Sequence, residues 1–215
     1  MRHRTLLAAL ALLAAAGTGF AQGYDWQIGG RGVFIAGGTP SAAVGDTGTL
    51  LDLDNGGGLE VNAWLMFSER FGAELSLGGV SQQLHAVGGS TCCGGVDAGR
   101  VWLLPLAVLA QYHQPVYGNW DPYVGVGVAW AAPIFSESQE LEGAGIVQLD
   151  LDGNPGIAVQ IGANYDLDNR WYANLDLRYL GVTLDARVRL EDGDAPPVTL
   201  DIKPWVFGIG FGYRF

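Results

Sequence analysis

The residues able to carry out acid–base or nucleophilic chemistry are few and scattered. Outside the N-terminal segment only His85 and His113 remain, and Ser81 and Ser90 are the serines nearest to His85. Their spacing does not give a Ser-His-Asp arrangement. The adjacent pair Cys92-Cys93 cannot join distant parts of the chain, and with two histidines it does not form a zinc-site pattern. We therefore expect no enzyme activity, no metal and no cofactor.

Six charged residues stand out because they interrupt segments that are otherwise apolar or rich in glycine. They carry both signs and are Arg31, Glu60, Glu74, Asp176, Arg178 and Arg214. In one narrow, enclosed interior these charges would have to pair, since a buried unpaired charge is costly. We interpret them as a lumen charge network that is needed for folding, with a transport relay as the alternative.

The elements that must position these charges show alternation with a period of two, which is typical of β-strands. In the last segment Trp205, Phe207 and Ile209 alternate with Val206, Gly208 and Gly210. Eight segments show this pattern with different strength: Trp26–Ala36, Leu59–Phe67, Phe71–Leu77, Val101–His113, Asp121–Ala131, Pro155–Asp166, Trp171–Tyr179 and Val198–Phe215. The sequence therefore predicts an all-β protein with eight antiparallel strands in up-and-down topology, closed by Val198–Phe215.

The apolar faces of these strands are expected to point outward, toward lipid. Aromatic residues gather at one set of strand ends, as in the interfacial girdle of a membrane barrel; they are Phe67, Phe71, Tyr112, Tyr165, Trp171, Tyr213 and Phe215. Short turns alternate with longer connections near 37–57, 87–99, 132–154 and 190–197. Lipid then requires closure, because an open strand edge would leave backbone groups unpaired in hydrocarbon. A soluble lipocalin-like barrel, with the apolar faces buried, is the alternative.

Composition and the N-terminus agree with an exported protein. Arg2 and Arg4 precede the apolar run Leu6–Ala16, and Gly19-Phe20-Ala21 offers a cleavage site. We expect a signal peptide at 1–21, with a retained anchor as the alternative, and one barrel domain at 22–215. The chain holds 34 Gly, 7 Trp, 8 Tyr and 8 Phe and has a net charge of −11, which argues against nucleic-acid partners.

An apolar surface is expected inside the barrel beyond the charged residues. After Tyr179 the apolar residues change parity, so that Val182 and Leu184 alternate with Thr183 and Asp185. Either a bulge resets the facing, or the strand rises above the lipid and turns its apolar side inward. In the second case an apolar vestibule would form from Val33, Ile35, Leu103, Val182 and Leu184.

Inward glycines also admit two interpretations. Gly125, Gly127, Gly208, Gly210 and Gly212 remove side-chain volume from the interior. They would either leave room for a passage or provide the kinks that small barrels need for closure.

Several segments, in order and spacing, resemble the outer membrane protein W family over almost the whole of 22–215. They are Leu104-Pro105 with Ala110-Gln111, Asp121–Gly127, Gly162–Tyr165 with Asn169–Trp171, and Lys203–Phe207 with Gly212–Phe215. The resemblance implies an eight-stranded barrel that passes small hydrophobic molecules. Cys92-Cys93 and Arg178 depart from the family pattern.

From these features we expect a passive channel in the outer membrane of a Gram-negative bacterium, with both termini in the periplasm. It would admit small hydrophobic molecules and release them laterally into the membrane. The alternatives are a structural or adhesive surface barrel and an outer-leaflet lipid-modifying enzyme. Expected partners are outer-membrane lipids, lipopolysaccharide and the assembly machinery, which would read Tyr213 and Phe215 as an assembly signal.

Overall fold

The computed structural model describes residues 25–36, 42–44, 49–88, 96–114, 116, 118–137, 146–190, 193–194 and 198–215. The expected signal peptide (1–21), Ser90 and Cys92-Cys93 lie outside these residues. The backbones of His85 and Leu184 are described, whereas their side chains are not. Within the described part of the chain, no helix is long and apolar enough to cross a membrane.

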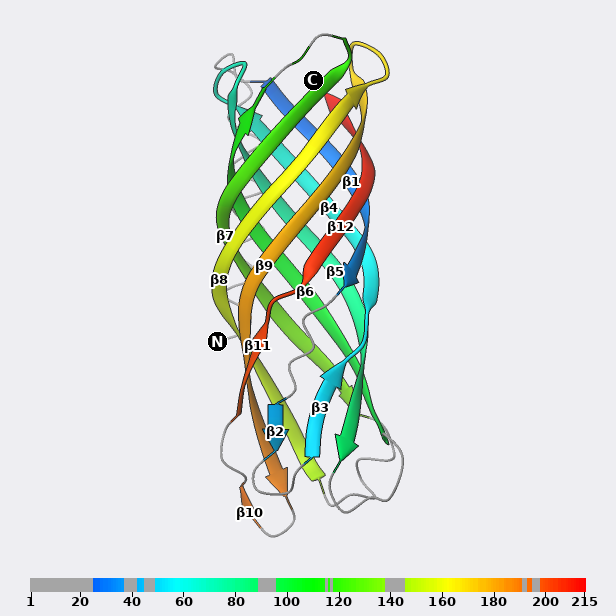
Figure 1. Cartoon of the computed structure of the whole chain (residues 1–215), viewed down its shortest axis with the longest axis vertical. Helices are drawn as coiled ribbons and strands as arrows, with labels where there is room; N and C mark the ends of the chain where they lie inside the picture. Colours follow the sequence, from blue (N-terminus) through cyan, green and yellow to red (C-terminus); the bar gives the residue numbers. More distant parts are fainter. Residues whose placement is uncertain are drawn as a thin grey trace.

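Eight long antiparallel strands form a closed barrel in the described residues (Figure 1). They are β1 (Asp25–Ala36), β4 (Gly56–Met66), β5 (Phe71–Gly88), β6 (Val96–His113), β7 (Trp120–Glu137), β8 (Ile146–Asp166), β9 (Trp171–Leu190) and β12 (Trp205–Arg214). Each strand pairs with the next one in this order, and β1 pairs with β12 to close the ring. The predicted eight-stranded, up-and-down barrel is confirmed.

The two ends of the barrel differ. At the turn end, which is at the top of Figure 1, the connections 67–70, 114–119 and 167–170 are short, and the chain ends there at Phe215. At the opposite loop end, four short strands extend the barrel; they are β2 (Ala42–Val44), β3 (Thr49–Leu53), β10 (Gly193–Asp194) and β11 (Val198–Ile202).

Side chains close two of the short turns. Ser68 Oγ accepts hydrogen bonds from the backbone N–H groups of Arg70 and Phe71, at 3.3 and 3.1 Å. In the 167–170 turn, Asp168 Oδ1 accepts from the N–H groups of Trp171 and Arg170, both at 2.7 Å. These two backbone bonds lower the pKa of the Asp168 carboxyl below its ordinary value.

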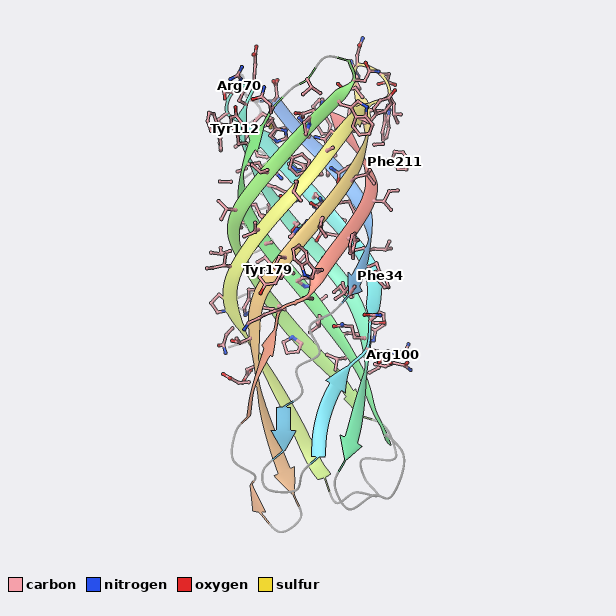
Figure 2. The ribbon with its side chains drawn as sticks, in the orientation of Figure 1. Phe34, Arg70, Arg100, Tyr112, Tyr179 and Phe211 are labelled. Atoms are coloured by element: carbon pink, nitrogen blue, oxygen red, sulfur yellow. The ribbon has the colours of Figure 1, made fainter. Side chains whose placement is uncertain are left out.

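The apolar faces point outward, as predicted. In β12, Phe207, Ile209 and Phe211 are 50–66% exposed, whereas the alternating residues between them are buried. Figure 2 shows the outward side chains along the wall, with Tyr112 and Phe211 nearer the turn end and Phe34 and Tyr179 farther from it. This exposure of large apolar side chains contradicts the soluble lipocalin-like alternative, in which they would be buried.

Strand pairing at the loop end extends further than the sequence indicated. The segment 146–154, which was expected to belong to a long connection, is strand because it pairs with β9 as far as Ile146–Leu190. The C-terminal segment Val198–Phe215 is two strands instead of one. β11 and β12 both pair with β9, and Pro204, which lacks a backbone N–H, lies in the break between them.

The inward face of β9 does not change parity. Leu180 and Val182 are buried on the same side as Asp176 and Arg178, so the facing continues while the side chains become apolar. The irregularity lies across from them in β8, between Asn154 and Ile157. Of the two interpretations for this segment, the structure therefore supports an apolar side turned inward.

Candidate functional site

Five of the six predicted network residues meet in the middle of the barrel. Arg31 from β1 and Glu60 from β4 are register partners, Glu74 comes from β5, and Asp176 and Arg178 come from β9. Each of these five residues is at most 5% exposed. We call these residues the charge plug.

Two guanidinium groups hold three carboxylates together. Arg31 lies 2.8 Å from Glu60 and 3.4 Å from Asp176, and it also pairs with Glu74. Arg178 lies 3.1 Å from both Glu60 and Asp176 and donates to Ser76 Oγ at 3.1 Å. Every charge in the plug has an opposite partner, which is the condition for burying it.

Amide side chains complete the plug by donating to its carboxylates. Asn62 donates to Glu60 at 2.7 Å and to Glu74 at 3.0 Å. Gln160 donates to Glu74 at 2.9 Å and to Asp176 at 2.6 Å, and Gln111 also donates to Glu74. These bonds fix the carboxylates from several strands, so the plug crosses the interior.

The inward glycines accommodate large interior side chains. A Cβ at Gly208 would lie 3.2 Å from Arg31 Cδ, and one at Gly212 would overlap the Tyr172 ring. At Gly125 it would lie 2.8 Å from the side-chain oxygen of Gln160, and at Gly127 it would overlap the neighbouring backbone. At these glycines the space is occupied, so they do not leave a passage.

Arg214 does not belong to the plug, contrary to the prediction. It pairs with Asp166 at 2.6 Å, and its side chain is 25% exposed. Its guanidinium carbon lies 4.6 Å from the centre of the Tyr172 ring. Arg214 pairs in register with Gln27, four residues from Arg31 toward the turn end, which is why it cannot reach the central charges.

A second polar layer, which the sequence analysis did not assign to the site, lies between the plug and the turn end. Asn174 accepts from Arg31 at 3.3 Å and donates to Tyr123 at 2.9 Å and to Asn164 at 2.8 Å. His113 lies 2.9 Å from Asp121 and stacks on Tyr123, with ring centroids 5.1 Å apart. Two features of the sequence could have predicted this layer: its residues alternate toward the interior, and their side chains are polar.

Buried apolar side chains line the interior on the other side of the plug. Val33, Ile35, Leu103 and Val182 from the predicted vestibule lie there, joined by Val80, Val101, Leu180 and Val206. These eight residues are 1–7% exposed, so they pack against neighbours and do not line an open funnel. We call them the apolar layer; the side chain of Leu184 is outside the described part.

The wall beside the apolar layer contains a short gap in strand pairing. Pairing between β5 and β6 runs to Leu77–Leu106 and resumes at Val80–Leu103, while Gly78 and Gly79 have no described pairing with Pro105 and Leu104. Pro105 has no N–H to donate, which weakens the ladder at this point. We call this feature the ladder gap.

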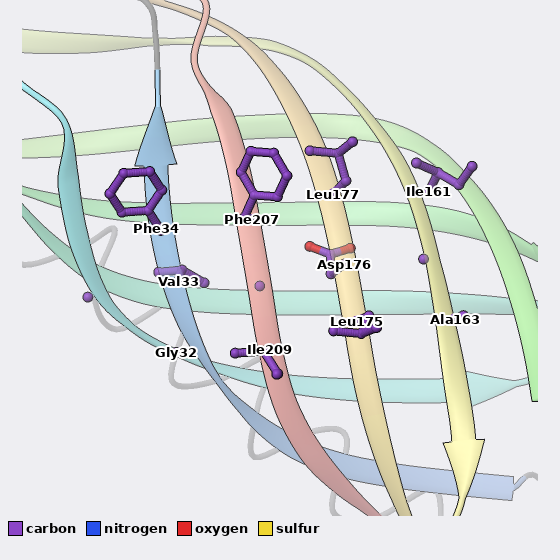
Figure 3. A pocket seen from close by; sticks show the side chains of 13 residues that line it. Gly32, Val33, Phe34, Ile161, Ala163, Leu175, Asp176, Leu177, Phe207 and Ile209 are labelled. Atoms are coloured by element: carbon purple, nitrogen blue, oxygen red, sulfur yellow. The ribbon is translucent and has the colours of Figure 1, made fainter.

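The outer wall carries a hollow of about 770 Å³ at the level of the plug (Figure 3). One row of its lining is Phe34, Phe207, Leu177 and Ile161, and the facing row includes Ile209, Leu175 and Ala163. The larger of these side chains are outward-facing and apolar, as a surface in contact with lipid requires.

The two residues of the predicted assembly signal lie at the turn end. The backbone N–H of Phe215 donates to the carbonyl of Trp26 at 3.1 Å, and its ring lies 5.2 Å from that of Tyr213. Tyr213 in turn meets Trp171, with ring centroids 5.0 Å apart. The last residues thus join the closing strand to both of its neighbours.

We predict that deletion of Phe215 sharply lowers the yield of folded protein in outer membranes, because it removes both the aromatic terminus and its bond to β1. The heat-modifiable band of the folded barrel measures this yield. Phe215→Tyr, which keeps an aromatic end, is the control and should fold normally. Unchanged folded yield after the deletion would contradict the assignment.

A closed antiparallel barrel with an apolar outer wall and a paired polar interior defines the class: an integral outer-membrane β-barrel. The sequence model of the OmpW family matches residues 37–215 of this chain. The chain therefore belongs to the OmpW family.

Individual relatives agree with this assignment. The chain is 30% identical over 206 residues to the outer-membrane protein y4mB of Sinorhizobium fredii, covering 94% of this chain and 86% of that protein. The crystal structure of OprG from Pseudomonas aeruginosa has the same fold, with a TM-score of 0.77 at 22% identity over 89% of this chain and 95% of that one. The dibenzothiophene metabolism operon protein PahQ of Pseudomonas aeruginosa is 30% identical over 122 residues, which are 56% of this chain and 54% of that protein. These relatives support an outer-membrane location in a Gram-negative bacterium.

Proposed function

We propose that this protein is a passive channel that admits small hydrophobic molecules from the cell exterior and releases them sideways into the outer membrane. The observation that carries the proposal is the ladder gap beside an apolar layer, on one side of a filled charge plug. In this proposal the turn end and both termini face the periplasm, and the loop end faces outward.

The charge plug argues against a straight path through the barrel. A hydrophobic solute would have to separate Arg31 and Arg178 from Glu60, Glu74 and Asp176, and removing a partner from a buried pair is strongly unfavourable. The solute would then meet the polar layer around Asn174 and gain little from burial there.

The apolar layer and the ladder gap favour lateral release. Apolar surface kept away from water contributes about 25 cal/mol per Å². Val80 and Leu103, the pair at which β5–β6 pairing resumes, belong to the apolar layer. A solute held in this layer would reach hydrocarbon by moving past the ladder gap, where Gly78 lies opposite Pro105 and Gly79 lies opposite Leu104.

One relative supports a hydrophobic cargo. PahQ is named for an operon of dibenzothiophene metabolism, and dibenzothiophene is an apolar aromatic molecule. The proposal assigns to this chain the same kind of cargo, small and apolar. Lipopolysaccharide and outer-membrane lipids are its proposed surroundings, and the assembly machinery is its proposed partner during insertion.

The close packing of the interior favours a second candidate, a structural or adhesive surface barrel. Val80 and Val101 are each only 1% exposed, so a solute needs movement of the apolar layer before it can enter. Transport therefore requires transient opening at the loop end, whereas a structural barrel requires none.

Uptake of a hydrophobic fluorescent probe into vesicles tests the proposal. Wild-type protein should accelerate uptake over empty vesicles, and Leu103→Asp or Val182→Asp should reduce it, because each places a charge in the apolar layer. Pro105→Ala, which restores an N–H in the ladder gap, should slow release. Val116→Asp, in an exposed position at the turn end, is the matched control. If wild-type protein takes up the probe no faster than empty vesicles do, the structural barrel is favoured. If both Asp variants take up the probe at the wild-type rate, the solute does not pass through the apolar layer.

A further inference from the structure

One polar side chain lies within the apolar layer. Gln82 on β5 points inward and is only 4% exposed, and its register partner on β6 is Val101. Val80 lies two residues away on the same inward face. A Cβ at Gly56, the register partner of Ile35, would overlap Gln82 Cγ. The amide group of Gln82 therefore lies among apolar side chains.

The hydrogen bonding of this amide leaves one atom free. Gln82 Nε2 donates to the backbone carbonyl of Asp54 at 2.9 Å. Within the part of the chain that the structure describes, Gln82 Oε1 is buried and accepts no hydrogen bond. Rotating the amide by half a turn would place Oε1 against the carbonyl oxygen of Asp54, so the bond to Asp54 determines that the oxygen is the free atom.

A buried acceptor without a donor is costly, and most such groups in proteins are paired. A hydrophobic residue of the same length would fill this position without that cost. Binding sites for small molecules have this composition: an apolar lining with a few placed polar groups that fix the orientation of the ligand. Gln82 Oε1 is such a group, and its missing partner is a hydrogen-bond donor.

The apolar layer restricts the kind of donor. A charged ammonium would lose its hydration among side chains such as Val80, Val101 and Ile35, which provide no opposite charge. A neutral hydroxyl or N–H group loses much less and regains a hydrogen bond at Gln82 Oε1. The ligand that fits is a small apolar molecule with one neutral donor.

The position of Gln82 places this contact early on the proposed path. β5 runs from Phe71 at the turn end to Gly88 at the loop end (Figure 1). Along its inward face, Glu74 of the charge plug is followed by Val80 and then by Gln82. A solute that comes from the loop end therefore meets Gln82 before it reaches Val80.

We propose that Gln82 is a specificity-determining residue of the apolar layer, and that its Oε1 accepts a hydrogen bond from a neutral O–H or N–H group of the cargo. This inference rests on the proposed function and specifies the cargo class. A site that forms this bond favours a donor-bearing solute over an analogue that lacks the donor.

Competition in the vesicle assay tests the assignment. Naphthol and its methyl ether share the same rings, but only naphthol has a donor, and each should inhibit protein-dependent uptake of the fluorescent probe. Gln82→Met keeps the length of the side chain and removes the acceptor. The half-inhibiting concentration of naphthol should then rise roughly five-fold, the value of one neutral hydrogen bond, while that of the ether stays unchanged.

The neighbouring glutamine provides the matched control. Gln83 is exposed on the outer face of β5, so Gln83→Met should leave both half-inhibiting concentrations unchanged. Gln82→Met also removes the bond to Asp54, but a merely structural effect would change the values for naphthol and the ether together. Heat modifiability reports that each variant is folded.

A second measurement needs only the wild-type chain. In isotope-labelled protein in lipid bilayers, the side-chain carbonyl resonance of Gln82 should shift with naphthol and stay in place with the ether. A resonance that responds to neither solute, as expected if a structural water alone occupies the acceptor, overturns the inference. So does an unchanged half-inhibiting concentration of naphthol in Gln82→Met, or an equal rise for both solutes; each of these outcomes leaves the proposed function standing. If wild-type protein does not take up the probe, the proposed function fails, and the resonance alone decides whether Gln82 binds the donor.

Discussion

Arg31→Met should destabilise the barrel by about 3–5 kcal/mol, because it leaves three buried carboxylates with Arg178 as their only cation in the plug. Methionine fills similar volume, so the lost charge dominates the effect. Urea unfolding of the protein in lipid bilayers measures the free energy of unfolding.

Two variants sharpen the interpretation of this result. Arg70→Met removes the same kind of side chain from an exposed turn and should change the free energy of unfolding by less than about 0.5 kcal/mol. Adding Glu74→Gln to Arg31→Met removes the carboxylate that Arg31 pairs with and should recover part of the loss. A cost for Arg31→Met as small as that of Arg70→Met would show that the plug charges are not coupled.

Leu175→Arg and Ile209→Arg should each cost about 2–4 kcal/mol, the cost of an arginine near the membrane midplane on a lipid-facing barrel surface. Both side chains are at least half exposed on the outer wall, where the new charge would meet hydrocarbon. Unfolding in bilayers again provides the measurement.

Arginine introduced at two other places in the barrel provides the controls for Leu175→Arg and Ile209→Arg. Leu167→Arg introduces the same charge in a short turn, where the side chain is 54% exposed, and should be tolerated. Gly210→Arg faces inward and should prevent folding, because even a Cβ there would overlap the carbonyl of Gly30 and lie 2.8 Å from Arg31 Cγ. Small and equal effects at Leu175 and Leu167 would mean that the assigned outer face does not contact lipid.

The sequence predicted whether a side chain points inward or outward much better than it predicted the position of that side chain along the barrel axis. Period-two alternation is a local property, so Arg31, Glu60 and Asp176 could be assigned to the interior from single strands. Height depends on strand tilt and on the stagger between strands. That is why Arg214, which was assigned to the same network, lies at the turn end with Asp166 instead of in the plug.

The amides and the loop end show why the rest was harder to predict. Asn62, Gln111 and Gln160 alternate inward like the charges, but only their placement on neighbouring and opposite strands makes them donors to Glu74. The acidic, glycine-containing segment 146–154 has the composition of a loop, and pairing with β9 overrides that preference.

The filled interior also affects the permeability of the outer membrane that contains this barrel. A water-filled porin lowers the resistance of the outer membrane to every polar solute that fits through it. Here paired charges and amides occupy the bore, so polar antibiotics gain no aqueous route through the protein. We therefore expect that a change in the number of copies in the outer membrane leaves the uptake of such drugs unchanged.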